Sequence, residues 1–115
     1  MRLRNSLAAA LGALTLVLTL PTSASAAVGD FEYTFIGETG QRLDNRLTDP
    51  GGEECINIAE ASGDSSSPVF APRNYTNATA TVFVEADCEG DEFYTLNPGK
   101  KVGDDLKFRS VVFNG

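Results

Sequence analysis

Apolar and polar side chains alternate in several short segments after residue 27, with the period of two that is typical of β-strands. The clearest alternation covers residues 80–88, where every second side chain is apolar or a cysteine. Shorter alternations cover residues 31–35 and 106–112. No long stripe with the 3.6-residue period of an amphipathic helix follows residue 26. The pattern therefore predicts an all-β domain.

Turn-forming residues separate these segments at short intervals. Residues 49–52 contain Asp, Pro and two Gly, and residues 62–68 form a polar, Ser-rich stretch. Residues 97–99 are Asn-Pro-Gly, which suits a type II turn because Pro sets φ and Gly supplies a positive φ. Residues 55–58 form a short apolar run between the first two breaks. Short, regularly spaced strands of this kind favour a small β-sandwich or barrel.

The N-terminal residues have the organisation of a secretory signal peptide. Arg2 and Arg4 give a positive start, and residues 7–20 are apolar apart from Gly and Thr. This run covers about 21 Å as a helix, which is short of the roughly 30 Å hydrocarbon core of a bilayer. Pro21 ends the run, and small residues of the type that a signal peptidase recognises follow at positions 24–26.

We therefore expect cleavage after Ala26, which divides the chain into a signal peptide, 1–26, and a single mature domain, 27–115. An uncleaved anchor and a buried helix are the alternatives. No other long apolar run occurs. The expectation is a secreted, extracellular protein that is a monomer and has no stable membrane insertion after cleavage.

Composition excludes several classes of function. The chain has no His and only two Cys, so it cannot form a Ser-His-Asp triad, a His-ligated metal site, a Cys₄ zinc site or a Cys-ligated iron–sulfur cluster. Its net charge of −7 argues against binding to nucleic acid, which needs a basic surface. Paired carboxylates could in principle cleave glycosidic bonds, but so small a domain has little room for a substrate cleft. We expect no enzyme activity.

The two cysteines, Cys55 and Cys88, are candidates for a disulfide. Small exported domains commonly use such a crosslink because their cores are small, and an even number of cysteines in an exported chain favours pairing. Closing a loop of about 34 residues stabilises the folded state by roughly 3–4 kcal/mol in the chain-entropy model. A reactive thiol pair is the alternative, which the absence of His disfavours.

The sequence also contains a weak internal repeat. Ser-Pro-Val-Phe at residues 67–70 resembles Ser-Val-Val-Phe at residues 110–113. Residues 56–58 lie before the first of these motifs, and residues 94–96 lie before the second, so the two segments are matched. Further upstream, the alternating apolar residues 31–35 are matched with residues 82–84. Two copies of a four-strand unit would give two Greek keys packed face to face.

Part of the second copy resembles the Greek-key signature of the βγ-crystallin family. That signature is an aromatic residue, four residues, a second aromatic, one residue, a glycine, and later a serine. Phe83, Gly90 and Ser110 fit it, whereas Cys88 stands where the family has an aromatic residue. In the first copy the spacing between the aromatic residues and Gly37 differs by one residue. The resemblance covers about the last forty residues.

The resemblance implies a Greek-key β-sandwich in which the glycine adopts a positive φ where the hairpin folds over. The serine hydroxyl ties the folded hairpin to the last strand, and a disulfide to Cys55 replaces the aromatic residue at position 88. Small secreted actinomycete proteins of this family include a metalloprotease inhibitor and a killer-toxin-like protein. The chain is similar to them in its Arg-containing start, Ala-rich signal and acidic mature domain.

Microbial members of the family often bind calcium, which makes two groups of residues candidate ligands. The family's calcium frame falls on residues 105–110, where Asp105 is suitable but Leu106 and Arg109 replace oxygen-bearing residues. Alternating acids at Glu85, Asp87, Glu89 and Asp91 form the second group, although the glutamate that an EF-hand requires is absent. We expect no tight calcium site and no other cofactor, and interpret the second group as a solvated hairpin face.

The chain also contains two sequons and a group of basic residues near its C-terminus. The sequons at Asn74 and Asn77 are interpreted as a polar entry into a strand, and the basic residues near the C-terminus as a charged hairpin face. Docking of that face to an acidic partner is the alternative. The expected function is extracellular binding of a protein partner. A protease inhibitor is the main alternative, with residues 63–71 and 97–103 as candidate loops, and a weak calcium-binding or toxin-like factor is the second.

Overall fold

The computed structural model describes residues 27–63 and 65–114, so the predicted signal peptide, 1–26, lies outside the described residues. The described chain is built of antiparallel strands and two short 3₁₀ turns, and the predicted all-β architecture is confirmed. The elements are β1 Gly29–Ile36, β2 Arg42–Thr48, β3 Ile56–Asn57, η3 Ala59–Ala61, β4 Val69–Thr76, β5 Thr79–Phe83, η4 Ala86–Cys88, β6 Phe93–Leu96, β7 Lys107–Phe108 and β8 Ser110–Asn114.

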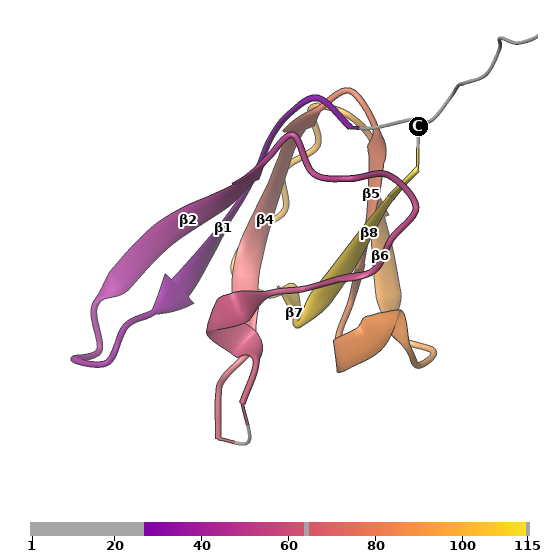
Figure 1. Cartoon of the computed structure of the whole chain (residues 1–115). Coiled ribbons are helices and arrows are strands. Elements are labelled where there is room, and N and C mark those ends of the chain that lie inside the picture. Colours follow the sequence, from indigo (N-terminus) through magenta and orange to yellow (C-terminus); the bar gives the residue numbers. More distant parts are fainter. Residues whose placement is uncertain (1–26, 64, 115) are drawn as a thin grey trace, which may run out of the picture.

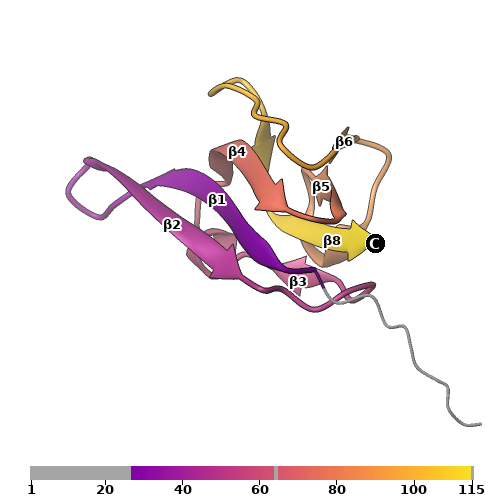
Figure 2. The ribbon, with the colours of Figure 1, turned by 90° about the horizontal axis from the view of Figure 1, so that it is seen from above.

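The strands form two four-stranded sheets that pack face to face (Figures 1 and 2). Sheet A has the order β2-β1-β4-β7, and sheet B has the order β3-β8-β5-β6. Each half of the chain contributes four strands. Three of them lie in one sheet, and the third in chain order, β3 or β7, lies in the other sheet. In this order β3 corresponds to β7 and β2 to β6. The predicted correspondence of residues 56–58 with residues 94–96 is thus wrong, because these segments belong to β3 and β6.

The core lies between the two sheets. Phe31 of β1 contacts Phe108 and Phe113 edge-to-face, with ring centroids 6.0 and 5.3 Å apart, and all three side chains are fully buried. Val82 of β5 and Val111 of β8 are paired neighbours in sheet B and are buried on the same face. Aromatic side chains from both sheets therefore interlock, and each edge-to-face pair adds about 0.5–1.5 kcal/mol beyond the burial of its area.

The strand predicted over residues 80–88 is shorter than its alternation suggests. β5 ends at Phe83, and the chain then turns through η4, in which Asp87 and Cys88 have φ values of +63° and +53°. Asn57 holds this turn, since its side chain accepts a hydrogen bond from the Asp87 N–H and donates one to the Asp87 carboxylate. Alternation continued past Phe83 because the turn residues happen to keep the same apolar spacing.

β4 contains an irregularity that explains how a proline fits within it. Glu32 is opposite Arg73 while Thr34 is opposite Phe70, so two residues of β4, Ala71 and Pro72, face one residue of β1. Ala71 has φ +55°. Such a bulge leaves one residue out of the ladder, which is where a residue without an N–H is tolerated.

The interpretation of Asn74 as a polar strand entry is wrong. Asn74 lies within β4, is fully buried, and donates hydrogen bonds to the carbonyls of Ala78 and Leu96 at 2.8 and 2.9 Å. Its carbonyl oxygen accepts from the backbone and hydroxyl of Thr76. The residue therefore stabilises the tight turn between β4 and β5 from inside the core.

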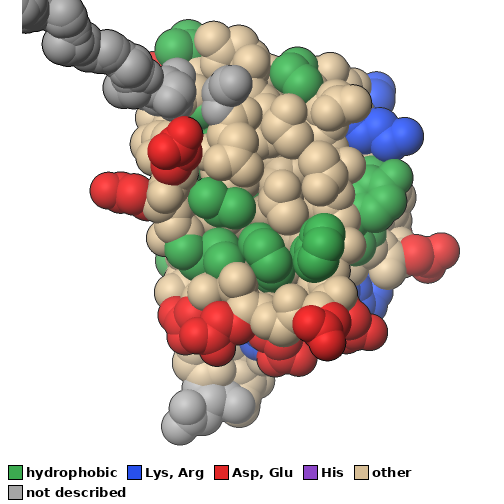
Figure 3. Space-filling view, turned by 90° about the vertical axis from the view of Figure 1, so that its right-hand side faces the viewer, with side chains coloured by type: hydrophobic (Ala, Val, Ile, Leu, Met, Phe, Trp, Pro, Cys, Tyr) green, Lys and Arg blue, Asp and Glu red, His purple; other side chains and the backbone are tan. Residues whose placement is uncertain are grey.

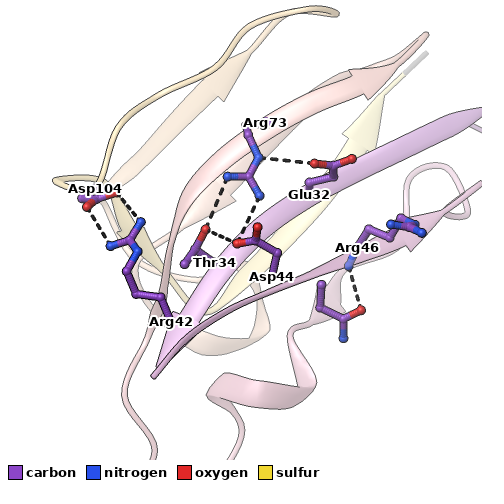
Figure 4. Close-up of polar contacts among 8 residues, drawn as sticks. Glu32, Thr34, Arg42, Asp44, Arg46, Arg73 and Asp104 are labelled. Carbon is purple, nitrogen blue, oxygen red and sulfur yellow. Dashed lines mark hydrogen bonds and ion pairs between the residues drawn. The ribbon is translucent and has the colours of Figure 1, made fainter. Parts of the chain in front are cut away.

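The outer face of sheet A carries a polar network that joins three strands (Figure 4). The guanidinium of Arg73 on β4 lies 3.5 Å from Glu32 on β1 and 3.7 Å from Asp44 on β2, and it donates to Thr34 at 3.3 Å. Thr34 in turn donates to Asp44 at 2.7 Å. A guanidinium that is largely shielded from water strengthens such contacts relative to exposed pairs. This network stabilises the pairing of the β1–β2 hairpin with β4.

Candidate functional site

Most of the residues singled out from the sequence meet at one corner of sheet B, where the turn after β5 folds over β8. The hydroxyl of Ser110 is fully buried at this corner. It donates a hydrogen bond to the Glu85 carbonyl at 2.6 Å and accepts one from the Cys88 N–H at 2.9 Å. Gly90 follows with φ +96°, in the region that side chains disfavour. One hydroxyl thus satisfies a donor and an acceptor of the folded turn.

The disulfide predicted between Cys55 and Cys88 is confirmed, with the two Cα atoms 5.9 Å apart. This separation is ordinary for a disulfide. Cys55 immediately precedes β3, and Cys88 ends η4, so the bond joins the first half of the chain to the second beside Ser110. No free cysteine occurs among the described residues.

An apolar patch lies on the outer face of sheet B beside this corner. Phe83 and Phe93 are paired across β5 and β6, with ring centroids 5.6 Å apart, and Phe93 is 58% exposed. Val112 lies on the same face because it pairs with Thr81, whose neighbours Ala80 and Val82 point into the core. Tyr94 is also exposed, at the sheet edge that β6 forms, but it pairs with the core residue Val82 and so lies on the opposite face. We call Phe83, Phe93 and Val112 the aromatic face.

A row of acidic side chains borders the aromatic face (Figure 3). The acids of the turn and of the following loop, which we call the acidic ridge, are all exposed; they are Glu85, Asp87, Glu89, Asp91 and Glu92. None of them forms an ion pair with a described residue. No group of three or more potential ligands that could hold a metal ion is found in the described parts of the chain. The ridge is therefore an uncompensated negative surface.

Residues 105–110, on which the family's calcium frame falls, lie in the loop before β7, in β7 and at the start of β8. Asp105 is exposed in the loop before β7, and Leu106 packs against the core. Arg109 directs its guanidinium away from this segment, donating at 3.1 Å to the carbonyls of both Ala61 and Ser66. The Ser110 hydroxyl is already engaged by the folded turn. Leu106, Arg109 and Ser110 thus have other contacts, whereas Asp105 is exposed.

The basic residues near the C-terminus do not form one face. Lys107 lies over the Phe70 ring, 5.3 Å from its centroid, and donates to the Asp104 carbonyl. The backbone of Lys101 forms an isolated β-bridge with that of Arg73. Arg109 is turned toward the Ser-rich loop. The side chains of Lys107 and Arg109 therefore contact different parts of the chain.

A groove that the sequence did not indicate lies between the end of the β1–β2 hairpin and the Ser-rich loop. Its volume is about 530 Å³, and its lining residues are Phe35, Ile36, Gly37, Glu38, Leu43, Glu60, Ser65, Ser66, Ser67 and Pro68. Glu60, in η3, accepts hydrogen bonds from the Tyr33 hydroxyl at 2.7 Å and from the Asn45 side chain at 2.6 Å. These three residues are far apart in sequence, and no local pattern links them.

Ionisation in the groove follows from these contacts. Partial burial raises the pKa of Glu60, but the hydrogen bonds from Asn45 and Tyr33 outweigh it, so the net pKa lies below the ordinary value. Burial, and then the hydrogen bond to Glu60, raise the pKa of the Tyr33 hydroxyl above its ordinary range. At neutral pH the pair is therefore a phenol that donates to a carboxylate.

The two candidate inhibitor loops differ in their attachment. Residues 97–103 lie along β4, where backbone hydrogen bonds join Asn74 to Lys100 and Val102 to Pro72. Residues 69–71 of the other candidate are buried in β4. The Ser-rich stretch before β4 projects from the sandwich (Figure 1), and Arg109 holds its base.

Comparison with known proteins does not assign the chain. No family model matches it, and neither the curated proteins nor the solved structures include a significant match. Within the described residues, no helix has the length and apolar character needed to cross a bilayer.

Proposed function

We propose that this protein is a secreted, non-enzymatic binding module that uses the aromatic face and the acidic ridge of sheet B to bind an extracellular protein. The observation that carries the proposal is an aromatic pair, in which Phe93 is exposed and Phe83 half-buried, directly beside a row of carboxylates that form no ion pairs with described residues (Figure 3). Aromatic side chains are enriched in the centres of protein interfaces, and charged residues are common at their rims. The partner proposed is a protein with a basic rim around an apolar centre.

The rigidity of this corner supports a binding role. Ser110, the disulfide and the two Asn57–Asp87 hydrogen bonds hold the turn that carries the ridge. A surface that is already ordered loses little conformational entropy when a partner binds. Uncompensated acids also accelerate association with a basic partner, and the acceleration falls as salt rises.

The finer fold assignment belongs to the same proposal. We take the two halves to be Greek keys of the βγ-crystallin type. Three observations support this: the matched strand order of the sheets, the positive φ of Gly90, and the buried Ser110 hydroxyl that joins the turn to the last strand. No cofactor is part of the proposed function.

Export is the remaining part of the proposal. The disulfide supports it because such bonds persist in oxidising compartments. N-terminal sequencing of protein recovered from the culture medium is expected to begin at Ala27. A sequence that begins at Met1 would contradict export through the predicted signal peptide.

A matched pair of aromatic substitutions tests the binding surface. Phe93→Ser removes the most exposed ring of the aromatic face, and Tyr75→Ser removes a similarly exposed ring, 46% accessible, from β4 of sheet A. Each variant is immobilised, and the extracellular proteins that it retains are compared with those retained by the wild type. We expect Tyr75→Ser to retain the same partner and Phe93→Ser to lose it. Elution by salt is expected because the ridge contributes electrostatically.

Two outcomes would contradict the proposal. Retention of the same proteins by Phe93→Ser would show that sheet B is not the binding surface. A wild-type protein that dimerises in sedimentation experiments, together with a monomeric Phe93→Ser variant, would assign the aromatic face to self-association instead. Both results are distinguishable from misfolding, because the thermal unfolding of each variant is measured in parallel.

Protease inhibition is the second candidate function, and one observation favours it. The Arg109 guanidinium joins the two ends of the Ser-rich loop through Ala61 and Ser66, which restrains the base of a projecting segment. A restrained loop suits insertion into a protease cleft. Inhibition of a panel of secreted metalloproteases by the wild type, weakened in Arg109→Ala, would support this function. The absence of inhibition across the panel would exclude it for those enzymes.

A further inference from the structure

The groove beside the β1–β2 hairpin is lined by negative charge and lies apart from the proposed binding face. Its walls combine apolar side chains, Phe35, Leu43 and Pro68, with the hydroxyl-bearing residues 65–67. The charged residues among its lining are the carboxylates Glu38 and Glu60. Among the described residues that line the groove, none is positively charged.

Glu60 is held in a fixed position without a compensating charge. Tyr33 donates to one of its oxygens and Asn45 to the other, and both donors are neutral. Of the ion pairs found among the described residues, none includes Glu60. A carboxylate can accept about four hydrogen bonds, so these two contacts leave lone pairs for further donors.

The support for Glu60 comes from the core rather than from the surface. Tyr33 is only 2% exposed and packs edge-to-face against Phe108, with ring centroids 6.3 Å apart. Asn45 belongs to β2, so the carboxylate joins η3 to the hairpin that forms one wall of the groove. A charge whose position is already set requires little reorganisation when an opposite charge approaches.

We infer that this groove binds the cationic side chain of an arginine or lysine that a protein partner presents, with the charged end at Glu60. The aliphatic stem of such a side chain matches the apolar walls, and its N–H groups match the free acceptor positions of the carboxylate and the serine hydroxyls. An arginine suits the site best, because its planar guanidinium donates several hydrogen bonds at once. The complementarity is of both charge and shape.

This inference is independent of the aromatic face. The groove lies between sheet A's β1–β2 hairpin and the Ser-rich loop, whereas the aromatic face belongs to β5, β6 and β8 of sheet B. Loss of binding at one surface therefore leaves the other unaffected in the tests below.

The test uses two small probes that differ in charge and hardly in shape. N-acetyl-arginine amide carries the guanidinium, and N-acetyl-citrulline amide replaces it by a neutral ureido group. Each is titrated into the ¹⁵N-labelled protein, and the amide resonances of Gly37, Glu60 and residues 65–67 are followed. We expect saturable shifts with the arginine probe, and binding of the citrulline probe weaker by about tenfold or more, as expected for loss of one charge-assisted hydrogen bond.

Two variants localise the effect. Glu60→Gln keeps the size of the side chain but removes its charge, and is expected to weaken arginine binding by about tenfold. Glu54→Gln removes one exposed charge that belongs neither to the groove nor to the acidic ridge, and is expected to leave the binding unchanged. The dispersion of the Glu60→Gln spectrum shows whether the variant is folded. If it is not, the comparison of the two probes on the wild type still decides.

Three results would overturn the inference. The first is the absence of saturable shifts at the groove with the arginine probe. The second is equal binding of the arginine and citrulline probes, which would show that charge is not recognised. The third is a loss of binding in Glu54→Gln equal to that in Glu60→Gln, which would assign the effect to the overall negative charge of the protein.

Discussion

Replacing Ser110 by alanine removes one oxygen atom that joins β8 to the turn after β5. Its hydroxyl is fully buried, donates to the Glu85 carbonyl at 2.6 Å and accepts from the Cys88 N–H at 2.9 Å. Alanine leaves both backbone groups without this partner. A buried polar group that loses its hydrogen bond costs about 1–3 kcal/mol. Because the two backbone groups are only partly buried, we expect a total loss of about 2 kcal/mol.

Urea denaturation of the disulfide-bonded protein measures this loss. With an m value of about 1.5 kcal/mol per molar, a destabilisation of about 2 kcal/mol lowers the midpoint by about 1.3 M. The matched control is Ser67→Ala, at an exposed serine whose hydroxyl bonds to no described residue. The control is expected to change the free energy of unfolding by no more than about 0.5 kcal/mol.

A midpoint for Ser110→Ala that equals the midpoint of Ser67→Ala would refute the reasoning. It would mean that water or a backbone rearrangement replaces the hydroxyl without loss. A changed m value would instead show that the variant alters the unfolded state or loses two-state behaviour, and the two cases are separable in the same data.

Four further results are expected. Gly90→Val forces a side chain into φ +96°, so denaturant midpoints should show a loss of about 1–3 kcal/mol, against no more than about 0.5 kcal/mol for Gly103→Val, which has open space. Replacing Cys55 and Cys88 by serine should cost roughly 3–4 kcal/mol, and thiol titration of the unreduced, unfolded wild type should find no free thiol. Millimolar calcium should hardly change the melting temperature, because the carboxylates form no cluster in the described residues; a rise of several degrees in scanning calorimetry would contradict this. Since folding lowers the pKa of Glu60, its stabilising effect is present above the unfolded pKa of about 4.3 and is lost as pH falls through the folded pKa, so the stability difference between wild type and Glu60→Gln should shrink below about pH 4.

The sequence predicted the strands whose two faces differ strongly in polarity. β1 and β5 bury one face in the core, so their alternation was visible. The alternation over residues 106–112 was misleading, because it runs from β7 into β8, which belong to different sheets, and β8 buries Val111 and Phe113 rather than Val112. β2 was missed because it is an edge strand of sheet A with mostly exposed residues on both faces, which removes the contrast on which alternation depends. β4 was obscured by Pro72 and by its buried polar residue Asn74, whose partners become apparent only in the folded chain.

The candidate surfaces were predictable to different degrees. Cys55 and Cys88 could be paired from composition alone, because only one pairing exists. The groove could not be predicted, since Glu60 lies in a short turn and its partners Tyr33 and Asn45 come from strands 27 and 15 residues away. Contacts at such separations leave no periodic trace in a single sequence.

The exchange of third strands between the sheets also bears on how the chain folds. β3 belongs to the first half of the chain but pairs with β8, and β7 belongs to the second half but pairs with β4. Neither half can complete its own sheet, so an isolated half would expose an unpaired strand edge. Folding therefore requires strand pairings between residues that are distant along the chain. Such pairings make folding slower than in a protein built from local contacts. The same exchange makes the two halves a single cooperative unit, in which the loss of either half removes the template on which the other is built.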